Sequence, residues 1–355
     1  MAGVRVGIVG CGDISRRYAT SIAAAQGLEL VAATDLAAGR AAALTAEFGG
    51  TPHASLDTLL GDDTVDVVVN LTAPQAHAGV SAAALEAGKH VYSEKPLALR
   101  HDEARELVEL AARRGVRLGC APTTMLGEAQ QTAWKLVREG AVGTVRAVYT
   151  EANWGRIESW HPTPQALYAV GPLVDVGVYP ITILTGMFGP ARRVLAYGTT
   201  LEPDRVTLSD APFRLEAPDF VVAVLELAGG VVVRLTATFY VPESKQRGLE
   251  LHGDRGSLFL ATWDAFDSRL ELLSARGGAY APVPLVREPY GGIEWSRGLV
   301  DLAEAIVEGR PHRASAEHAA HVVEILCGAD ESMRSGGPVA IGSSFEQPAP
   351  LPWAR

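Results

Sequence analysis

The sequence predicts an α/β protein: a doubly wound parallel sheet, followed by a C-terminal α/β domain with an open, largely antiparallel sheet. Short apolar strands alternate with amphipathic helices in the first third of the chain, which is the rhythm of strand–helix–strand units. Later, paired runs such as Phe220–Leu227 and Val231–Tyr240 alternate apolar and polar residues, as hairpins do. The expected domains are 1–121 and 122–355, the second ending in helices within 293–335 and a proline-rich tail, 336–355.

Composition excludes several classes of protein. The 355 residues carry a formal net charge of −10, whereas binding nucleic-acid phosphates requires clustered Lys and Arg. The cysteines Cys11, Cys120 and Cys327 are too scattered for a disulfide framework, and no cluster has metal-ligand spacing. The N-terminus lacks a signal-peptide pattern, and no apolar run approaches the length of a membrane span. We therefore expect a cytoplasmic protein that needs no metal and acts on a small molecule.

The first strand and its turn indicate a dinucleotide site. Val4–Val9 runs into a G-x-G-x-x-S turn, and a helical pattern follows. Gly10 permits the tight turn, Gly12 lets a pyrophosphate approach the backbone, and the helix N-terminus offers its N–H groups. An ordinary βα turn can carry the same glycines, so the motif needs support from its context. The cofactor-binding candidates in this turn are Gly10, Gly12, Asp13, Ile14 and Ser15.

Support comes from the second strand, Leu28–Thr34, which ends at Asp35. A carboxylate about 20 residues past the glycines accepts hydrogen bonds from an adenosine ribose. It also repels a 2′-phosphate, so we expect NAD as the cofactor and regard NADP as the less favoured choice. Arg40 lies close enough in sequence to act in the opposite direction. Asp35 could instead cap the helix that follows it.

The strand Val65–Leu71 leads to another turn, with the pattern N-x-T-x-P-x-x-H. The carboxyl ends of parallel strands meet at one edge of a sheet, so this turn is expected to face the nicotinamide half of the cofactor. Its candidate cofactor-binding residues are Asn70, Thr72, Pro74 and His77. His77 could equally be a surface residue of the following helix, and its chemistry alone favours that alternative.

Glu94-Lys95-Pro96 is the expected chemical centre. Pro96 supplies no N–H for a sheet and disfavours helix in the residue before it, so Lys95 should lie at the carboxyl end of a strand, where open α/β sheets bind ligands. There Lys95 can donate a hydrogen bond or, if desolvated, transfer a proton near neutral pH. Glu94 is counted among the cofactor-binding residues, and the alternative is a surface ion pair between Glu94 and Lys95. A helix over His101–Arg114 and a strand at Val116–Cys120 complete the domain.

In the second domain, the segment Gly155–Ala169 breaks the periodic pattern between a predicted strand and the next helix. Trp160, His161 and Tyr168 combine aromatic faces with polar edges, which suits a sugar ring with its C–H faces and hydroxyl edges. We name them as substrate-binding candidates. A packed surface loop could have the same composition.

A second chemical centre lies in the helix predicted between Pro172 and Gly189. Asp175 and Tyr179 are four residues apart, so they share one face of a helix and can point at one ligand. Pro180 should kink this helix or remove a hydrogen bond, a local conflict that is typical of functional sites. Tyr179 could instead be a core aromatic residue with a satisfied hydroxyl.

The glycine turn, Asp35, the Asn70–His77 pattern and Glu94-Lys95-Pro96, in this order, resemble the glucose–fructose oxidoreductase/inositol dehydrogenase family. The resemblance covers nearly the whole chain. It implies an N-terminal Rossmann domain and a C-terminal α/β domain whose free sheet face forms a homodimer or homotetramer. It also implies that Lys95 lies beside the nicotinamide and contacts the reacting hydroxyl.

The expected reaction is NAD-dependent hydride transfer at a secondary alcohol or ketone of a sugar or cyclitol-like substrate. Lys95 and Tyr179 are the proton-transfer candidates, and Asp175 would orient Lys95 or bind an adjacent hydroxyl. Asp175 with a tyrosine four residues later, Tyr179, resembles the glucose–fructose oxidoreductase and dihydrodiol dehydrogenase branch. Pro180 stands where the inositol dehydrogenase branch carries an aspartate. Two alternatives remain: a non-catalytic nicotinamide or sugar sensor, and a glycosidase or lyase that retains NAD and oxidises its sugar transiently.

Overall fold

The computed structural model describes residues 3–274 and 278–355. The chain divides into two compact units, and each is described by itself. Unit 1 comprises 1–123 and 294–323, and unit 2 comprises 124–293 and 324–355. The functional division expected from the sequence, 1–121 and 122–355, stays a prediction.

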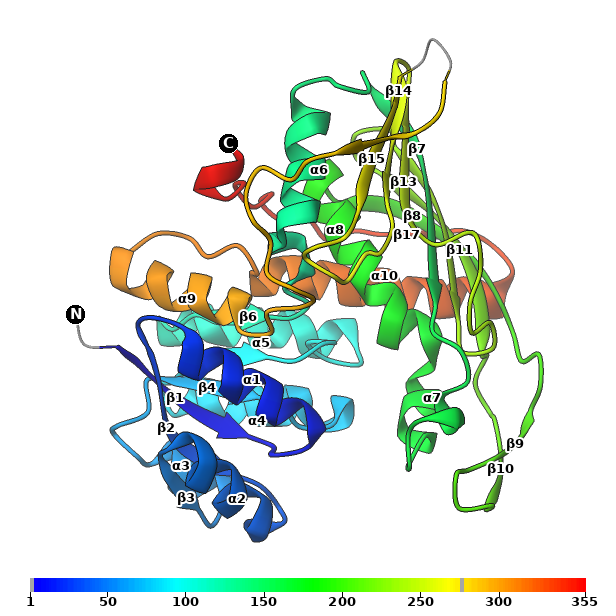
Figure 1. Ribbon diagram of the computed structural model, residues 1–355. Helices are drawn as coiled ribbons and strands as arrows, with labels where there is room; N and C mark the ends of the chain where they lie inside the picture. The colour runs from blue at the N-terminus through cyan, green and yellow to red at the C-terminus, as the bar shows by residue number, and fades with distance from the viewer. Residues whose placement is uncertain (1–2, 275–277) are drawn as a thin grey trace. The chain divides into compact units, whose positions relative to one another are not determined.

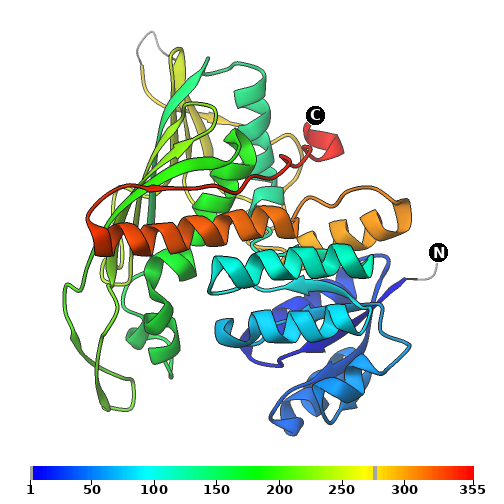
Figure 2. The same ribbon diagram turned by 180° about the vertical axis from the view of Figure 1, so that it is seen from behind.

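Unit 1 is built on a six-stranded sheet in the order β3-β2-β1-β4-β5-β6, and every pairing in it is parallel. Helix α1 lies on one face of this sheet, and α4 and α5 lie on the other (Figures 1 and 2). The predicted doubly wound parallel sheet is therefore confirmed. The strands are β1 Val4–Val9, β2 Leu28–Thr34, β3 Thr51–His53, β4 Val67–Asn70, β5 His90–Ser93 and β6 Leu118–Cys120; the helices are α1 Asp13–Ala24, α2 Ala38–Phe48, α3 Leu56–Leu60, α4 His77–Glu86, α5 His101–Arg114 and α9 Arg297–Glu308.

Helices on both faces explain why the central strands read as unbroken apolar runs. All residues of β4 are buried, and Ile8 of β1 is 0 % exposed. One hydrophobic core joins Ile8, Ile22 of α1 and Leu299 of α9. The polar residues that follow the strands are thereby gathered at the carboxyl edge of a rigid sheet.

Unit 2 contains a nine-stranded sheet in the order β16-β15-β14-β13-β7-β12-β11-β8-β17, antiparallel except between β7 and β12. Helices α6 and α8 lie on one side, and no helix among the described residues covers the other (Figures 1 and 2). The open, largely antiparallel sheet is confirmed, and so is the predicted hairpin of Phe220–Leu227 with Val231–Tyr240. The strands of unit 2 are β7 Val145–Asn153, β8 Ala191–Thr199, β9 Asp204–Val206, β10 Pro212–Arg214, β11 Phe220–Leu227, β12 Val232–Thr238, β13 Gly248–Gly253, β14 Gly256–Leu260, β15 Leu270–Ser274, β16 Ala281–Val283 and β17 Val339–Ala340, of which β9 and β10 form a separate two-stranded sheet; the helices are α6 Glu128–Arg138, α7 Gln165–Pro172, α8 Val178–Phe188 and α10 Ala316–Ser335, which begins in unit 1.

The helical stretch Gln165–Phe188 is interrupted by its own sequence. Helix α7 already begins at Gln165, so the expected irregular segment is shorter than predicted, and the break comes at Gly171, whose φ is 77°. A π-helical turn, Leu173–Gly177, then precedes α8. Pro180 explains the wider turn, because its ring would clash with the carbonyl of residue 176 in a regular α-helix. By length and mean hydropathy (1.6) the stretch could cross a membrane, but 61 % of its most apolar window is buried within the protein, as in a core helix.

Candidate active site

The glycine turn after β1 leaves room for a ligand. Gly10 has a φ of 92°, and a Cβ there would lie 2.8 Å from the backbone of Leu71, so only glycine fits. A Cβ on Gly12 would meet nothing within 4 Å. Gly12 is the N-cap of α1, and no side chain caps this helix end. The other candidates of the turn, Asp13, Ile14 and the buried Ser15, form the first turn of α1. Open space beside a helix N-terminus is what a pyrophosphate requires.

Asp35, at the end of β2, joins two turns. Its Oδ2 accepts a hydrogen bond from the Cys11 N–H and its Oδ1 accepts one from the Ala37 N–H, both at 2.7 Å. Burial, and then the charge of Asp35, raises the pKa of the Cys11 thiol to about 11, whereas the positive charge of Arg40 acts to lower it. Asp35 thus holds both the glycine turn and the start of α2. The charge of Arg40 acts on the same Cys11 thiol as the charge of Asp35 does.

The turn after β4 is held by buried polar groups. Asn70 is 0 % exposed; its Nδ2 donates to the carbonyl of His77 (3.0 Å) and its Oδ1 accepts from the Thr72 hydroxyl (2.6 Å). His77 is 1 % exposed, with its ring nitrogens 2.7 Å from the Pro96 carbonyl oxygen and 2.9 Å from that of Thr72. Pro74 begins a 3₁₀ turn that leads into α4. His77 is therefore not the exposed helix residue considered as an alternative. Its ring links this turn, through Thr72, to the turn that follows β5, through Pro96.

Lys95 follows β5 and is partly buried. The preceding Glu94 is 8 % exposed; its Oε1 accepts from the Tyr18 hydroxyl (2.7 Å) and its Oε2 from the Lys95 backbone N–H (3.0 Å). The Glu94 N–H donates to the Asn70 carbonyl (2.8 Å). The backbone that carries Lys95 is thus fixed by buried hydrogen bonds, which a positioned proton-transfer group needs.

In unit 2, Asp175 and Tyr179 are partly exposed, whereas most of the segment 172–181 is buried. The Tyr179 ring lies 5.0 Å from the Trp263 ring, centroid to centroid, and Trp263 lies 6.1 Å from Trp154. Trp263 is buried, but Trp154 is 41 % exposed. Tyr179 therefore belongs to an aromatic cluster, defined here as Trp154, Trp263 and Tyr179, that has an exposed end.

Trp160 and His161 lie just before α7, with their rings edge to face at 5.4 Å and Trp160 50 % exposed. Tyr168 is different, because it is 5 % exposed and its hydroxyl donates to Glu158. Burial, and then this hydrogen bond, raises the pKa of Tyr168 above its ordinary value, so the phenol keeps its proton and continues to donate. Tyr168 supports the segment that carries Trp160 and His161, a role that its sequence context did not reveal.

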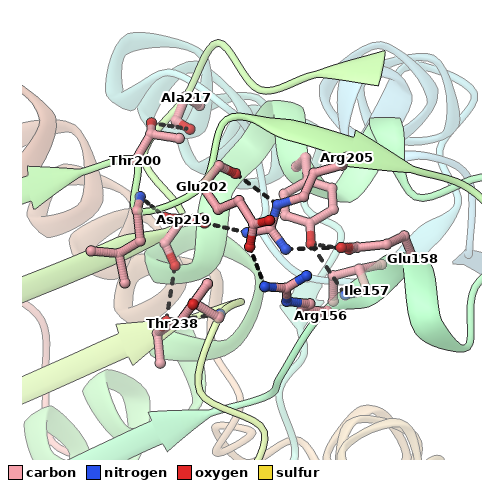
Figure 3. Close-up of polar contacts among 12 residues, drawn as sticks. Arg156, Ile157, Glu158, Thr200, Glu202, Arg205, Ala217, Asp219 and Thr238 are labelled. Carbon is pink, nitrogen blue, oxygen red and sulfur yellow. Dashed lines mark hydrogen bonds and ion pairs between the residues drawn. The ribbon is translucent and has the colours of Figure 1, made fainter. Parts of the chain in front are cut away.

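A buried ion cluster, consisting of Glu158, Arg205 and Asp219, anchors the same segment (Figure 3). The Arg205 side chain is 1 % exposed; its Nη1 donates to Glu158 (2.8 Å) and its Nη2 to Asp219. The neighbouring Arg156 pairs with Glu202. Position 205 lies on β9 and position 219 just before β11, so the segment is held by distant parts of the chain.

Sequence reasoning missed Trp154, Trp263 and the ion cluster. Trp154 had a usable signal, since it is the last residue of the strand predicted over 143–154, but nothing local connects it to Trp263. In residues 3–274 and 278–355, no group of three or more His, Cys, Asp or Glu side chains is placed to hold a metal ion.

Comparison with known proteins identifies relatives along most of the chain. Residues 4–121 match the oxidoreductase family with an NAD-binding Rossmann fold, and residues 130–259 match the GFO/IDH/MocA C-terminal domain. An uncharacterised oxidoreductase of Rhizobium meliloti is 32 % identical over 263 residues, covering 72 % of this chain and 74 % of that protein. The 1,5-anhydro-D-fructose reductase of Ensifer adhaerens is 29 % identical over 262 residues, with the same coverage.

Solved structures share the fold over nearly the full length. A levoglucosan dehydrogenase in complex with NADH and levoglucosan superimposes with a TM-score of 0.83 at 22 % identity, covering 96 % of this chain and 99 % of that one. A 3-ketoreductase from Actinomadura kijaniata in complex with NADP gives a TM-score of 0.74 at 23 % identity, covering 93 % and 97 %. At these identities the likeness establishes the fold.

Proposed function

Because the chain belongs to the GFO/IDH/MocA family of oxidoreductases, we propose that it transfers a hydride between NAD and a secondary alcohol or ketone of a sugar or cyclitol-like compound. The observation that carries this proposal is the position of Lys95 at the carboxyl end of β5, on backbone fixed by Glu94 and His77. The substrate class is supported by a relative that reduces 1,5-anhydro-D-fructose and by a structural neighbour that binds levoglucosan.

The chain's own residues would hold the substrate and move one proton. When bound, the nicotinamide supplies the hydride chemistry. Lys95 would hydrogen-bond the reacting oxygen and take or give its proton, and Tyr179 is the second group able to do so. If Tyr179 transfers the proton, Lys95 stays charged and polarises the carbonyl. Asp175 would bind a hydroxyl next to the reacting carbon, and Trp160 and His161 would line the substrate.

Asp35 should set the cofactor preference. Its carboxylate repels a 2′-phosphate, and Arg40 is nearby to receive one, so Asp35→Ser should shift the ratio of kcat/KM for NAD to that for NADP by about tenfold or more toward NADP. Steady-state kinetics with both cofactors would measure this ratio. Asp102→Ser, on the exposed start of α5, serves as the control. An unchanged ratio in Asp35→Ser would contradict the assignment.

We also propose that a second copy of the chain covers the open sheet face of unit 2. Tyr197 and Leu195 of β8 are 65 % and 43 % exposed, and Tyr149 of β7 is 44 % exposed on the same face. Exposed apolar residues gathered in this way mark an interface. The double variant Leu195→Glu/Tyr197→Glu should lower the molar mass in light scattering to that of a monomer, while Leu208→Glu, on the β9–β10 connection, should not. A wild-type protein that is already monomeric would refute the proposal.

The proposed activity is tested by single-turnover absorbance at the reduced-nicotinamide band, with NAD and a panel of aldoses, ketoses and cyclitols. A stoichiometric signal with one class of compound would establish the reaction and its substrate class. Cofactor that copurifies and never exchanges would favour the glycosidase or lyase reaction instead. NAD binding without any signal would favour the sensor.

A further inference from the structure

We propose that Trp154 is a stacking platform for the substrate's sugar ring, held in place by Trp263, which also positions Tyr179. The inference rests on the proposed function, because it assigns the surface against which the reacting sugar lies. It concerns the aromatic cluster of unit 2 and involves no residue of unit 1.

Trp263 is fixed on several sides. Its ring Nε1–H donates to the Glu151 carbonyl of β7 (3.1 Å), and its own carbonyl accepts from the side-chain amide of Gln130 (3.1 Å). Gln130, on α6, is 0 % exposed and also donates to the carbonyl of Ala265 (3.0 Å). Because Trp263 is 6 % exposed, its ring is a buried support rather than a surface residue. Packing and hydrogen bonds of this kind lock a side chain in one orientation.

Trp154 extends this support to the surface. Its backbone N–H donates to the Thr238 carbonyl of β12 (3.0 Å), which continues the sheet by one residue past β7. Its ring is tilted by 35° against Trp263 and yet remains 41 % exposed. Gly155, with a φ of 74°, then turns the chain away. A single exposed tryptophan is common on protein surfaces and does not by itself indicate a site. Trp154, however, packs beside Trp263, which also contacts the candidate catalytic residue Tyr179.

The aromatic cluster offers the two kinds of contact that a sugar substrate requires, a polar group for its hydroxyls and a flat apolar surface for its ring face. Tyr179 and Trp263, tilted by 39°, place a hydroxyl-bearing ring at one end of the cluster, and Trp154 places an uncharged face at the other. A pyranose or cyclitol presents C–H groups on its ring faces and hydroxyls at its edges. Asp175, four residues before Tyr179 and partly exposed like it, offers a carboxylate to those hydroxyls. The structure thus assigns a ring-form monosaccharide or cyclitol as the ligand.

Calorimetric titration tests the platform without turnover. Aldoses and cyclitols would be titrated into the NADH-loaded enzyme, wild type beside Trp154→Ala, Trp154→Phe and Tyr290→Ala. Tyr290 is the matched control, because it is 45 % exposed and lies outside the cluster. We expect Trp154→Ala to raise the Kd of the best ligand about tenfold or more, Trp154→Phe to keep it within about threefold, and Tyr290→Ala to leave it unchanged.

The outcomes separate the platform from the proposed reaction. An unchanged Kd in Trp154→Ala, or a wild-type enzyme that binds no sugar, would overturn the platform. Thymidine monophosphate is a second probe, since flat bases also stack on exposed indoles; binding of this nucleotide that depends on Trp154, with sugars unaffected, would also overturn the sugar assignment. Sugar binding that depends on Trp154 without any hydride transfer would support the platform and refute the proposed oxidoreductase activity.

Discussion

Lys95→Ala should lower kcat by about 10²–10⁴-fold, the usual cost of losing a positioned proton-transfer group. The Kd for NAD should change by less than about twofold, because the glycine turn and Asp35 follow other strands, β1 and β2, and are held together by their own hydrogen bonds. The buried contacts of Glu94 involve its own carboxylate and backbone, so the fold should survive the change. Steady-state kinetics and a cofactor titration measure the two effects separately.

Lys245→Ala is the matched control, since Lys245 lies exposed in the connection between β12 and β13. It should keep both kcat and the Kd for NAD. If Lys95→Ala turned over at a near-normal rate, Lys95 would have no part in proton transfer, and Tyr179 would be the remaining candidate. Parallel losses of NAD binding and turnover would instead make Lys95 a cofactor-binding residue only.

Arg205→Met should lower the free energy of unfolding of unit 2 by about 3–5 kcal/mol, because it leaves two buried carboxylates without their counter-charge. Glu158 and Asp219 have side chains that are 8 % and 0 % exposed, so water cannot replace the guanidinium. Urea denaturation followed by tryptophan fluorescence is a suitable measurement. Of the 6 tryptophans, only Trp295 lies in unit 1, so the signal reports mainly on unit 2.

Arg214→Met provides the comparison on the neighbouring strand. Arg214 pairs with Asp204 on the surface, where both side chains are more than half exposed, so its loss should cost less than about 1 kcal/mol. The triple variant Arg205→Met/Glu158→Gln/Asp219→Asn should recover part of the stability, because it removes the unpaired charges. Equal effects of Arg205→Met and Arg214→Met would show that the cluster does not anchor the segment.

The elements of unit 1 could be predicted because their signals are local. Strand β1, strand β2 and helix α5 have the predicted bounds, since apolar runs, Gly10 and Gly115 define them within a few residues. The polar residues after these strands follow from the same logic, because parallel strands bring their carboxyl ends to one edge.

The environment of individual side chains could not be predicted, because it depends on contacts distant in sequence. His77 is buried by hydrogen bonds to Pro96 and Thr72, and Tyr168 is buried against Glu158 and Arg205. A composition of aromatic and polar residues does not distinguish a ring that faces a substrate from one that supports the loop beneath it. The partnership of Trp154 with Trp263 likewise arises only when β7 and the β14–β15 connection meet.

The most direct test of the account is transfer of deuterium from C4 of the reduced cofactor to a keto-sugar in a single turnover. Product would be analysed by mass spectrometry for the wild type and for Lys95→Ala. We expect one deuterium per product molecule on the carbinol carbon, and we expect the labelled product to form about 10²–10⁴-fold more slowly in the variant. Label at that carbon with equal rates in both proteins, or cofactor oxidation without label in the sugar, would contradict this expectation.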